Sequence, residues 1–199
     1  MKKLMLSAIT LTAAASVFAQ GTVTFNMRVA GIGTTHVFGP DGLLIGTVGG
    51  MTGSTTFATL IGAPGSNAPE SIMLPSITLP TTFRTGAAAG IVVATTDTFS
   101  NILPDSAVAT FEMVAWDNSS GLYPTWTWAS DAVKNGLIIG GASAPFVLEN
   151  IGGVVNVPPG IVSSIPGQGL QSFTLMPEPT SVTLVSLGAA ALWMFHRRK

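Results

Sequence analysis

The fold class of this chain is set by the stretch TVTFNMRV, residues Thr22–Val29. Polar and apolar residues alternate along it without a break, which is the two-residue period of a β-strand with one buried face. The apolar side chains on that face are Val23, Phe25, Met27 and Val29. We therefore expect the folded part of the chain to begin with a half-buried strand.

Short segments of similar character follow along the chain. The expected strands are Leu43–Val48, Thr55–Leu60, Ile72–Leu79 in two pieces around Pro75, Ile91–Thr96, Val108–Asp117, Pro145–Leu148 and Gln171–Leu175. The expected turns, rich in Gly, Pro, Asn and Ser, are Gly39–Gly42, Gly62–Gly65 and Asn118–Gly121. About eight short strands at fairly regular spacing predict a mainly β fold, an antiparallel β-sandwich or jelly roll.

One short helix is expected between the strands, over Thr125–Asn135. The residues at helical spacing on its apolar face are Trp126, Ala129, Val133 and Leu137, and those on its polar face are Asp131 and Lys134. Gly136 suits the position that ends a helix. We expect this helix to cover one end or face of the sandwich.

The length indicates one domain, and the distribution of charge argues against a nucleic-acid binder. The chain has 199 residues, of which 9% are charged and 47% hydrophobic, with 23 Gly, 13 Pro and no Cys. Residues 20–175, called the body below, hold three basic and eight acidic residues. A mildly acidic body has no basic face to neutralise phosphates, which excludes nucleic acid as a partner. The absence of cysteine excludes thiolate catalysis and Cys-ligated zinc.

The first residues, 1–19, have the three parts of a secretory signal peptide. Lys2 and Lys3 come first, an uncharged apolar stretch follows, and small residues precede a cut after Ala19. We expect the secretion translocon to export the chain and Gln20 to begin the mature protein. A buried N-terminal helix is the alternative interpretation.

The last residues have the pattern of a weak membrane anchor. Pro177-Glu178-Pro179 is followed by an uncharged run to Phe195 and then by His196, Arg197, Arg198 and Lys199. The 17 residues from Pro179 to Phe195 would span about 25 Å as a helix, against about 30 Å for a hydrocarbon core. Snorkelling basic side chains extend that reach, and the positive-inside rule places the basic end in the cytoplasm. A C-terminal transmembrane helix is therefore expected.

This tail resembles the PEP-CTERM sorting domain, and the resemblance covers residues 176–199. It rests on the motif Pro177-Glu178-Pro179, the apolar run and the basic cluster Arg197-Arg198-Lys199, together with the signal peptide. The resemblance implies that an exosortase-type enzyme recognises the motif and removes the helix. It also implies a transient inner-membrane anchor, then display at the cell surface or release, in bacteria that make extracellular polysaccharide. The alternative is a lasting anchor that is never processed.

An aromatic cluster is the strongest candidate site in the body. Trp116, Trp126, Trp128 and Tyr123 lie close together in the sequence. Trp116, Trp128 and Tyr123 are the candidate glycan contacts, since aromatic faces suit the apolar faces of sugar rings. The alternative is that these rings pack in the core, with Trp126 buried.

The other candidates carry weaker chemistry. Asp117–Gly121 offers oxygen atoms to calcium, or is simply a polar turn after a strand. His36 is the single histidine of the body, and neither a nucleophile motif nor a metal-ligand pair accompanies it. We expect no cofactor and no catalytic residue. The leading hypothesis is a non-enzymatic surface or matrix-associated protein; a carbohydrate-binding module or adhesin is the alternative, and a hydrolase with two carboxylates is a third.

Overall fold

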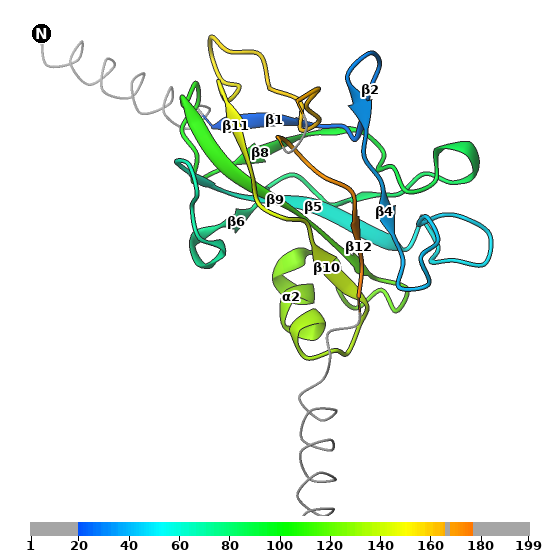
Figure 1. Cartoon of the computed structure of the whole chain (residues 1–199). Coiled ribbons are helices and arrows are strands. Elements are labelled where there is room, and N and C mark those ends of the chain that lie inside the picture. Colours follow the sequence, from blue (N-terminus) through cyan, green and yellow to red (C-terminus); the bar gives the residue numbers. More distant parts are fainter. Residues whose placement is uncertain (1–19, 166–167, 177–199) are drawn as a thin grey trace, which may run out of the picture.

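The computed structural model describes residues 20–165 and 168–176 (Figure 1). The expected signal peptide, residues 1–19, lies outside the described residues, as do the expected sorting motif Pro177-Glu178-Pro179 and the basic cluster Arg197-Arg198-Lys199. The described part is mainly β, with antiparallel sheets and one α-helix, as the sequence predicts.

Two long strands form the centre of the molecule. β5 (Thr56–Pro64) and β9 (Val108–Asp117) run antiparallel, in register from Thr56↔Asp117 to Pro64↔Ala109. β10 (Gly140–Ala142) and β11 (Phe146–Glu149) pair one after the other with the free edge of β9. β6 (Leu74–Pro75) and β7 (Thr81–Thr82) pair with the free edge of β5, which completes a six-stranded sheet.

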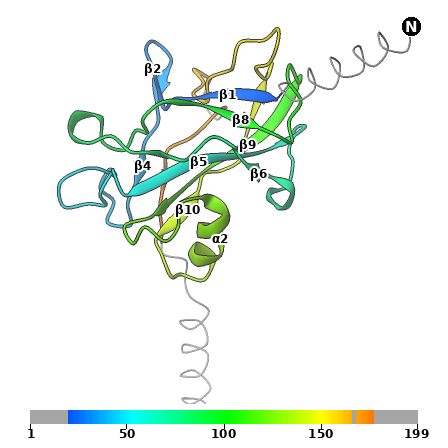
Figure 2. The same ribbon diagram turned by 180° about the vertical axis from the view of Figure 1, so that it is seen from behind.

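Three two-stranded pieces complete the β structure. β1 (Gly21–Phe25) pairs antiparallel with β8 (Thr95–Phe99) and lies over one face of the central sheet (Figures 1 and 2). β2 (Arg28–Val29) and β3 (Gly33–Thr34) form a small hairpin. β4 (Val37–Phe38) pairs parallel with β12 (Phe173–Thr174). The layer that faces the central sheet is thus made of separate pieces rather than of one continuous second sheet.

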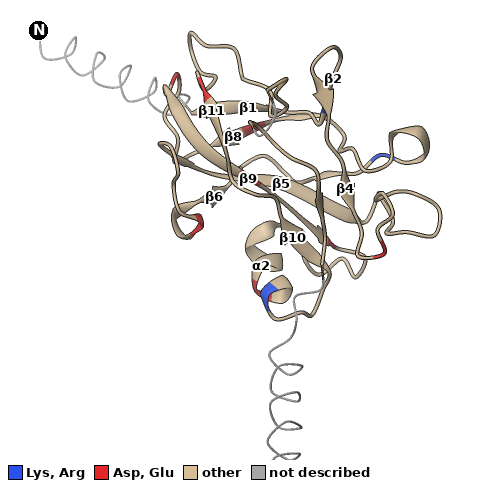
Figure 3. Cartoon of the chain, viewed as in Figure 1, with Lys and Arg blue, Asp and Glu red and all other residues tan. Residues whose placement is uncertain are grey.

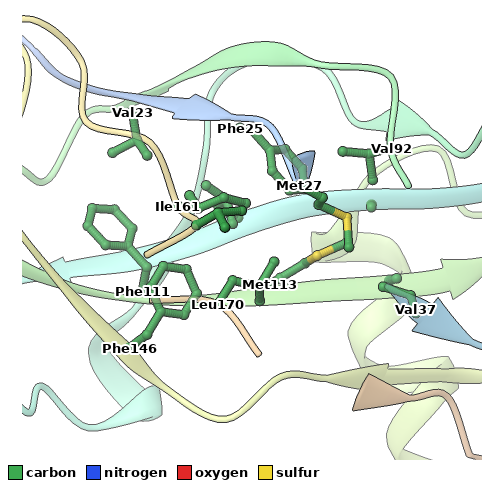
Figure 4. Close-up of a cluster of buried hydrophobic side chains, with 14 of the residues drawn as sticks. Val23, Phe25, Met27, Val37, Val92, Phe111, Met113, Phe146, Ile161 and Leu170 are labelled. Carbon is green, nitrogen blue, oxygen red and sulfur yellow. The ribbon is translucent and has the colours of Figure 1, made fainter. Parts of the chain in front are cut away.

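The main core lies between β1 and the central sheet. Val23, Phe25 and Met27 are fully buried, which confirms the predicted face of the opening stretch (Figure 4). Regular pairing stops at Phe25, and the stretch continues as β2. Alternate residues of β9 supply the opposite wall, where the ring of Phe111 meets that of Phe99 edge-on at a centroid distance of 5.1 Å.

The other face of β9 is covered by the helix α2 (Trp126–Lys134). Ala129 and Val133 of α2 pack on Val114 and Trp116, which form a second, smaller core with Ile61. Because both faces of β9 are buried, its sequence is apolar almost throughout instead of alternating. The predicted helix is confirmed within one residue at each end.

The helix nevertheless ends before its predicted apolar face does. Leu137 was expected on the buried face, but 71% of its surface is exposed. Gly136 adopts φ 65°, the left-handed conformation that turns the chain away from a helix end. The reversal takes Leu137 off the face that α2 packs against the sheet.

Several expected boundaries are wrong for identifiable reasons. Leu43–Val48 forms only an isolated bridge at Leu44, because its neighbours are engaged in consecutive turns. The expected turn Gly62–Gly65 belongs mostly to β5, where pairing with β9 continues through Pro64 and only Gly65 has a positive φ. Within residues 20–165 and 168–176, no helix is long and apolar enough to cross a membrane.

Candidate functional site

Trp116 is a core residue, so the prediction that it contacts glycans at the surface is wrong. Its side chain is fully buried, and its indole N–H donates to the carbonyl of Tyr123 at 2.8 Å. The ring meets Phe57 at 6.0 Å and Trp126 at 5.6 Å between centroids. The reason is positional: residue 116 falls on the side of β9 that α2 covers.

The rest of the aromatic cluster divides between core and surface. Tyr123 is half-buried, and its backbone N–H donates to Asn118 Oδ1 at 2.8 Å. Trp126 is half-buried and lines a hollow of about 150 Å³ beside Thr78 and Leu79. Trp128 is 67% exposed, on the face of α2 that points away from the sheet. Of the three candidate glycan contacts, Trp128 is therefore the one that is exposed to solvent.

The loop Asp117–Gly121 is folded as a hydrogen-bonded turn. Gly121 N–H donates to the Asn118 carbonyl at 2.9 Å. One carboxylate oxygen of Asp117 accepts from Ser119 N–H at 2.8 Å and the other from Ser119 Oγ at 3.1 Å. These contacts engage the oxygens that a calcium ion would use, which favours the polar-turn interpretation. In the described part of the chain no three His, Asp or Glu side chains gather as a metal cluster.

His36 stands apart from the carboxylates. Its ring lies against Phe38 at 6.5 Å between centroids, and its backbone N–H donates to Ser172 Oγ at 2.9 Å. Both contacts belong to the edge where β4 meets β12.

Two carboxyl groups are buried, but in different layers of the molecule. Asp97, on β8, is 1% exposed; burial raises its pKa to about 7, although a hydrogen bond from Leu60 N–H at 3.3 Å opposes the shift. Glu112, on the α2 side of β9, has a raised pKa because it is desolvated and because the charge of Glu70 lies near it. Since β5 and β9 separate Asp97 from Glu112, they do not form the facing pair of a glycosidase cleft.

A groove that sequence reasoning missed runs along the open edge of β11. Its volume of about 750 Å³ lies within the usual range for ligand sites. Asn150 N–H donates to the Ala107 carbonyl in continuation of the β9–β11 ladder. Because hydrogen-bonding directions alternate along an antiparallel strand, the backbone groups of Val147 and Glu149 point away from β9, toward the groove. Polar residues that line the rest of it are Ser163, Ser164 and Gln168.

A second hollow, of about 180 Å³, is lined by Arg28 and Arg84 together with Asn26. No sequence motif predicts this hollow, because the two arginines are far apart in the chain.

Comparison with protein-family models, with curated proteins and with solved structures finds no match.

Proposed function

We propose that this chain is an exported, non-enzymatic surface protein with a sandwich-like body. Its tail holds it for a time in the inner membrane, until an exosortase-type enzyme acts at Pro177-Glu178-Pro179. The observation that carries the proposal is the order of residues in the tail, where Pro177-Glu178-Pro179 directly precedes an uncharged run and a final basic cluster. Met176, which immediately precedes the motif, still forms a backbone hydrogen bond with the body.

The chain is held in the fold up to that residue. Leu175 is fully buried, and its N–H donates to the Phe38 carbonyl at 2.8 Å. Met176 N–H donates to the Gly140 carbonyl at 3.2 Å, which ties the end of the body to β10. The backbone is therefore hydrogen-bonded to the body up to Met176, the residue directly before the motif.

The apolar run of the tail begins close to this point. From Met176 to Thr180 the chain advances four residues, which span at most about 14 Å in any conformation. The headgroup layer of one leaflet is about 5–8 Å thick, from the difference between total and hydrocarbon thickness. A chain anchored by residues 180–195 would thus hold the end of its body at the headgroup surface.

The residues near that end suit such a position. Leu137 and Met176 are exposed apolar side chains, and Lys134 is the last residue of α2. Two exposed apolar side chains and a lysine are compatible with a membrane interface, where aliphatic groups enter the boundary region and an ammonium group meets headgroups.

Intact mass spectrometry of the protein from its native host tests export and sorting. Membrane and extracellular fractions are measured separately, for the wild type and for a variant with Glu178→Ala. We expect a wild-type mass that lacks residues 1–19 and the segment beyond the motif, and a variant that keeps the tail. A wild-type protein that retains Lys199 in the membrane fraction would instead mean a lasting anchor, and sorting would be refuted.

Labelling tests the tethered geometry. The chain has no cysteine, so Leu137→Cys and Val154→Cys each give a single site for a polarity-sensitive fluorophore. Val154 is an exposed control on the loop that follows β11. With the full chain in vesicles we expect a blue-shifted emission at position 137 alone. Equal emission at both positions would show that the α2 end does not meet the bilayer.

A second candidate function is glycan binding, which the exposed ring of Trp128 favours. Trp128→Ala is expected to lower the affinity for a polysaccharide ligand, because a stacking face is lost. Leu122→Ala removes a similarly exposed apolar side chain from the preceding loop and serves as the control. Unchanged affinity in a titration of Trp128→Ala would exclude this residue as a contact.

A further inference from the structure

Two of the three basic residues of the body line the same hollow. Arg28, Arg84 and Lys134 are the Lys and Arg residues between positions 20 and 175. Lys134 ends α2, whereas Arg28 and Arg84 line the same hollow of about 180 Å³. None of the eight acidic residues of the body lines that hollow. Figure 3 shows how sparse charged residues are elsewhere in the described part of the chain.

The fold builds this hollow from two distant segments. The β1–β8 ladder ends at Phe25↔Thr95, so the next residues, Asn26 and Ala94, continue side by side beyond it. The chain that leads into β8 turns back on itself between Arg84 and Ile91, where Arg84 N–H donates to the Ile91 carbonyl at 2.8 Å. Arg84, at the start of this turn, therefore lines the same hollow as Asn26 and Arg28, which follow β1.

The polar groups at the hollow are donors. The Oδ1 atom of Asn26 already accepts from Arg28 N–H at 3.1 Å, which leaves its amide N–H groups to donate. Arg84 Nε donates to the Val92 carbonyl at 3.3 Å, which steadies the side chain and leaves the terminal Nη groups. Among the described residues, neither these Nη groups nor the guanidinium of Arg28 has a hydrogen-bond partner.

We propose that this hollow, lined by Asn26, Arg28 and Arg84, binds an oxyanion: a carboxylate, sulfate or phosphate group. A planar guanidinium presents paired N–H donors that match two oxygens of such a group, and two of them supply both charge and geometry. Small or aliphatic residues, Ala88, Ile91 and Ala94, form the rest of the lining. Their short or aliphatic side chains leave room for a group of few atoms, and both arginines are exposed to solvent beside them. The site does not depend on the proposed sorting of the tail.

Calorimetric titration of the full chain in a non-ionic detergent tests the site and distinguishes the sources of the anion. The probes are sodium phosphate, sodium sulfate, a uronic-acid oligosaccharide and a neutral oligosaccharide of equal length. We expect binding of at least one anionic probe and none of the neutral sugar. A preference for the uronic-acid oligosaccharide would identify an acidic polysaccharide as the ligand, and a preference for phosphate would identify a phosphoryl group. Failure of all three anions to bind would overturn the proposal.

Charge-matched variants separate a built site from general electrostatics. Arg28→Gln and Arg84→Gln are each expected to lower the association constant about tenfold or more, as the loss of a charge-assisted hydrogen bond does. Lys134→Gln removes the same charge from α2 and is expected to bind like the wild type. Equal losses in all three variants would overturn the proposal. Circular dichroism checks that each variant is folded. If Arg84→Gln is unfolded, Arg84→Lys replaces it. Lysine keeps the positive charge but lacks the paired N–H donors of the guanidinium group, so weaker binding than that of the wild type is expected.

Discussion

The buried carboxyl group of Asp97 is expected to make the stability of this protein fall as the pH rises. Asp97 pairs with Val23 across the β1–β8 ladder, and its side chain accepts from Leu60 N–H of β5. It thus lies between the two layers of the main core, 1% exposed. Burial disfavours the charged form, and the pKa rises from 3.8 to about 7.

The sign and size of the effect follow from that difference. In the unfolded chain the group ionises near its ordinary pKa of 3.8, but in the folded protein only near 7. The stabilisation is therefore fully present below pH 4 and is lost as the pH rises through 7. A difference of about three pH units corresponds to about 4 kcal/mol in the free energy of unfolding, of which roughly 3 kcal/mol is lost between pH 5 and 8.

Asp97→Asn removes the titration while it preserves an oxygen that accepts from Leu60 N–H. We expect this variant to lose most of the fall in stability between pH 5 and 8. Urea unfolding of the full chain, followed by far-UV circular dichroism at several pH values, measures it. Glu112, whose pKa is also raised, adds a slope of the same sign to both proteins, so their difference isolates Asp97.

A control variant takes a carboxylate from the surface instead. Asp131→Asn changes the exposed face of α2 and is expected to keep the slope of the wild type, because Asp97 is intact. The reasoning would be refuted if Asp97→Asn kept the full fall between pH 5 and 8, or if the stability of the wild type did not change over this range.

Three further predictions concern packing and charge. Gly62→Ala is expected to destabilise the fold by about 1–3 kcal/mol, since a Cβ atom there would lie 2.6 Å from the ring of Phe111; Gly141→Ala, whose Cβ would meet only ordinary contacts, is the control in urea unfolding. Trp116→Phe leaves the half-buried Tyr123 carbonyl without its indole donor and is expected to cost about 1 kcal/mol, measured as a shift of the urea midpoint. Asp105 accepts hydrogen bonds from three backbone N–H groups, which lower its pKa. Asp105→Asn is therefore expected to lower the urea midpoint at pH 7, and this loss should shrink as the pH falls through the pKa of the folded state. A loss that does not depend on pH would contradict this cause.

Local patterns were sufficient where one element carries its own signal. The bounds of β9, Val108–Asp117, and the buried face of β1 are as the alternation and apolar runs predict. The helix α2 follows from apolar residues at helical spacing and from Gly136 at its end. Each of these signals depends on residues within a few positions of one another, which a sequence displays directly.

Local patterns failed where pairing with a distant strand decides the outcome. Gly62–Gly65 has the residues of a turn, yet nine successive pairs with β9 keep most of it in β5. Leu43–Val48 has the residues of a strand, yet no neighbouring strand is available beyond the bridge at Leu44. The free energy of the long-range ladder and of core burial outweighs the intrinsic preference of a few residues.

The sequence by itself determined the mainly β class, the single helix of the body and the pattern of its two ends, because these depend on local periodicity and composition. Only the tertiary structure decided which chemical groups meet. It buried Trp116 beneath α2, left Trp128 exposed, and brought Arg28 and Arg84 to one hollow. The physical reason is that a ligand-binding arrangement is made by side chains from segments distant in sequence, whose approach is set by strand pairing and packing.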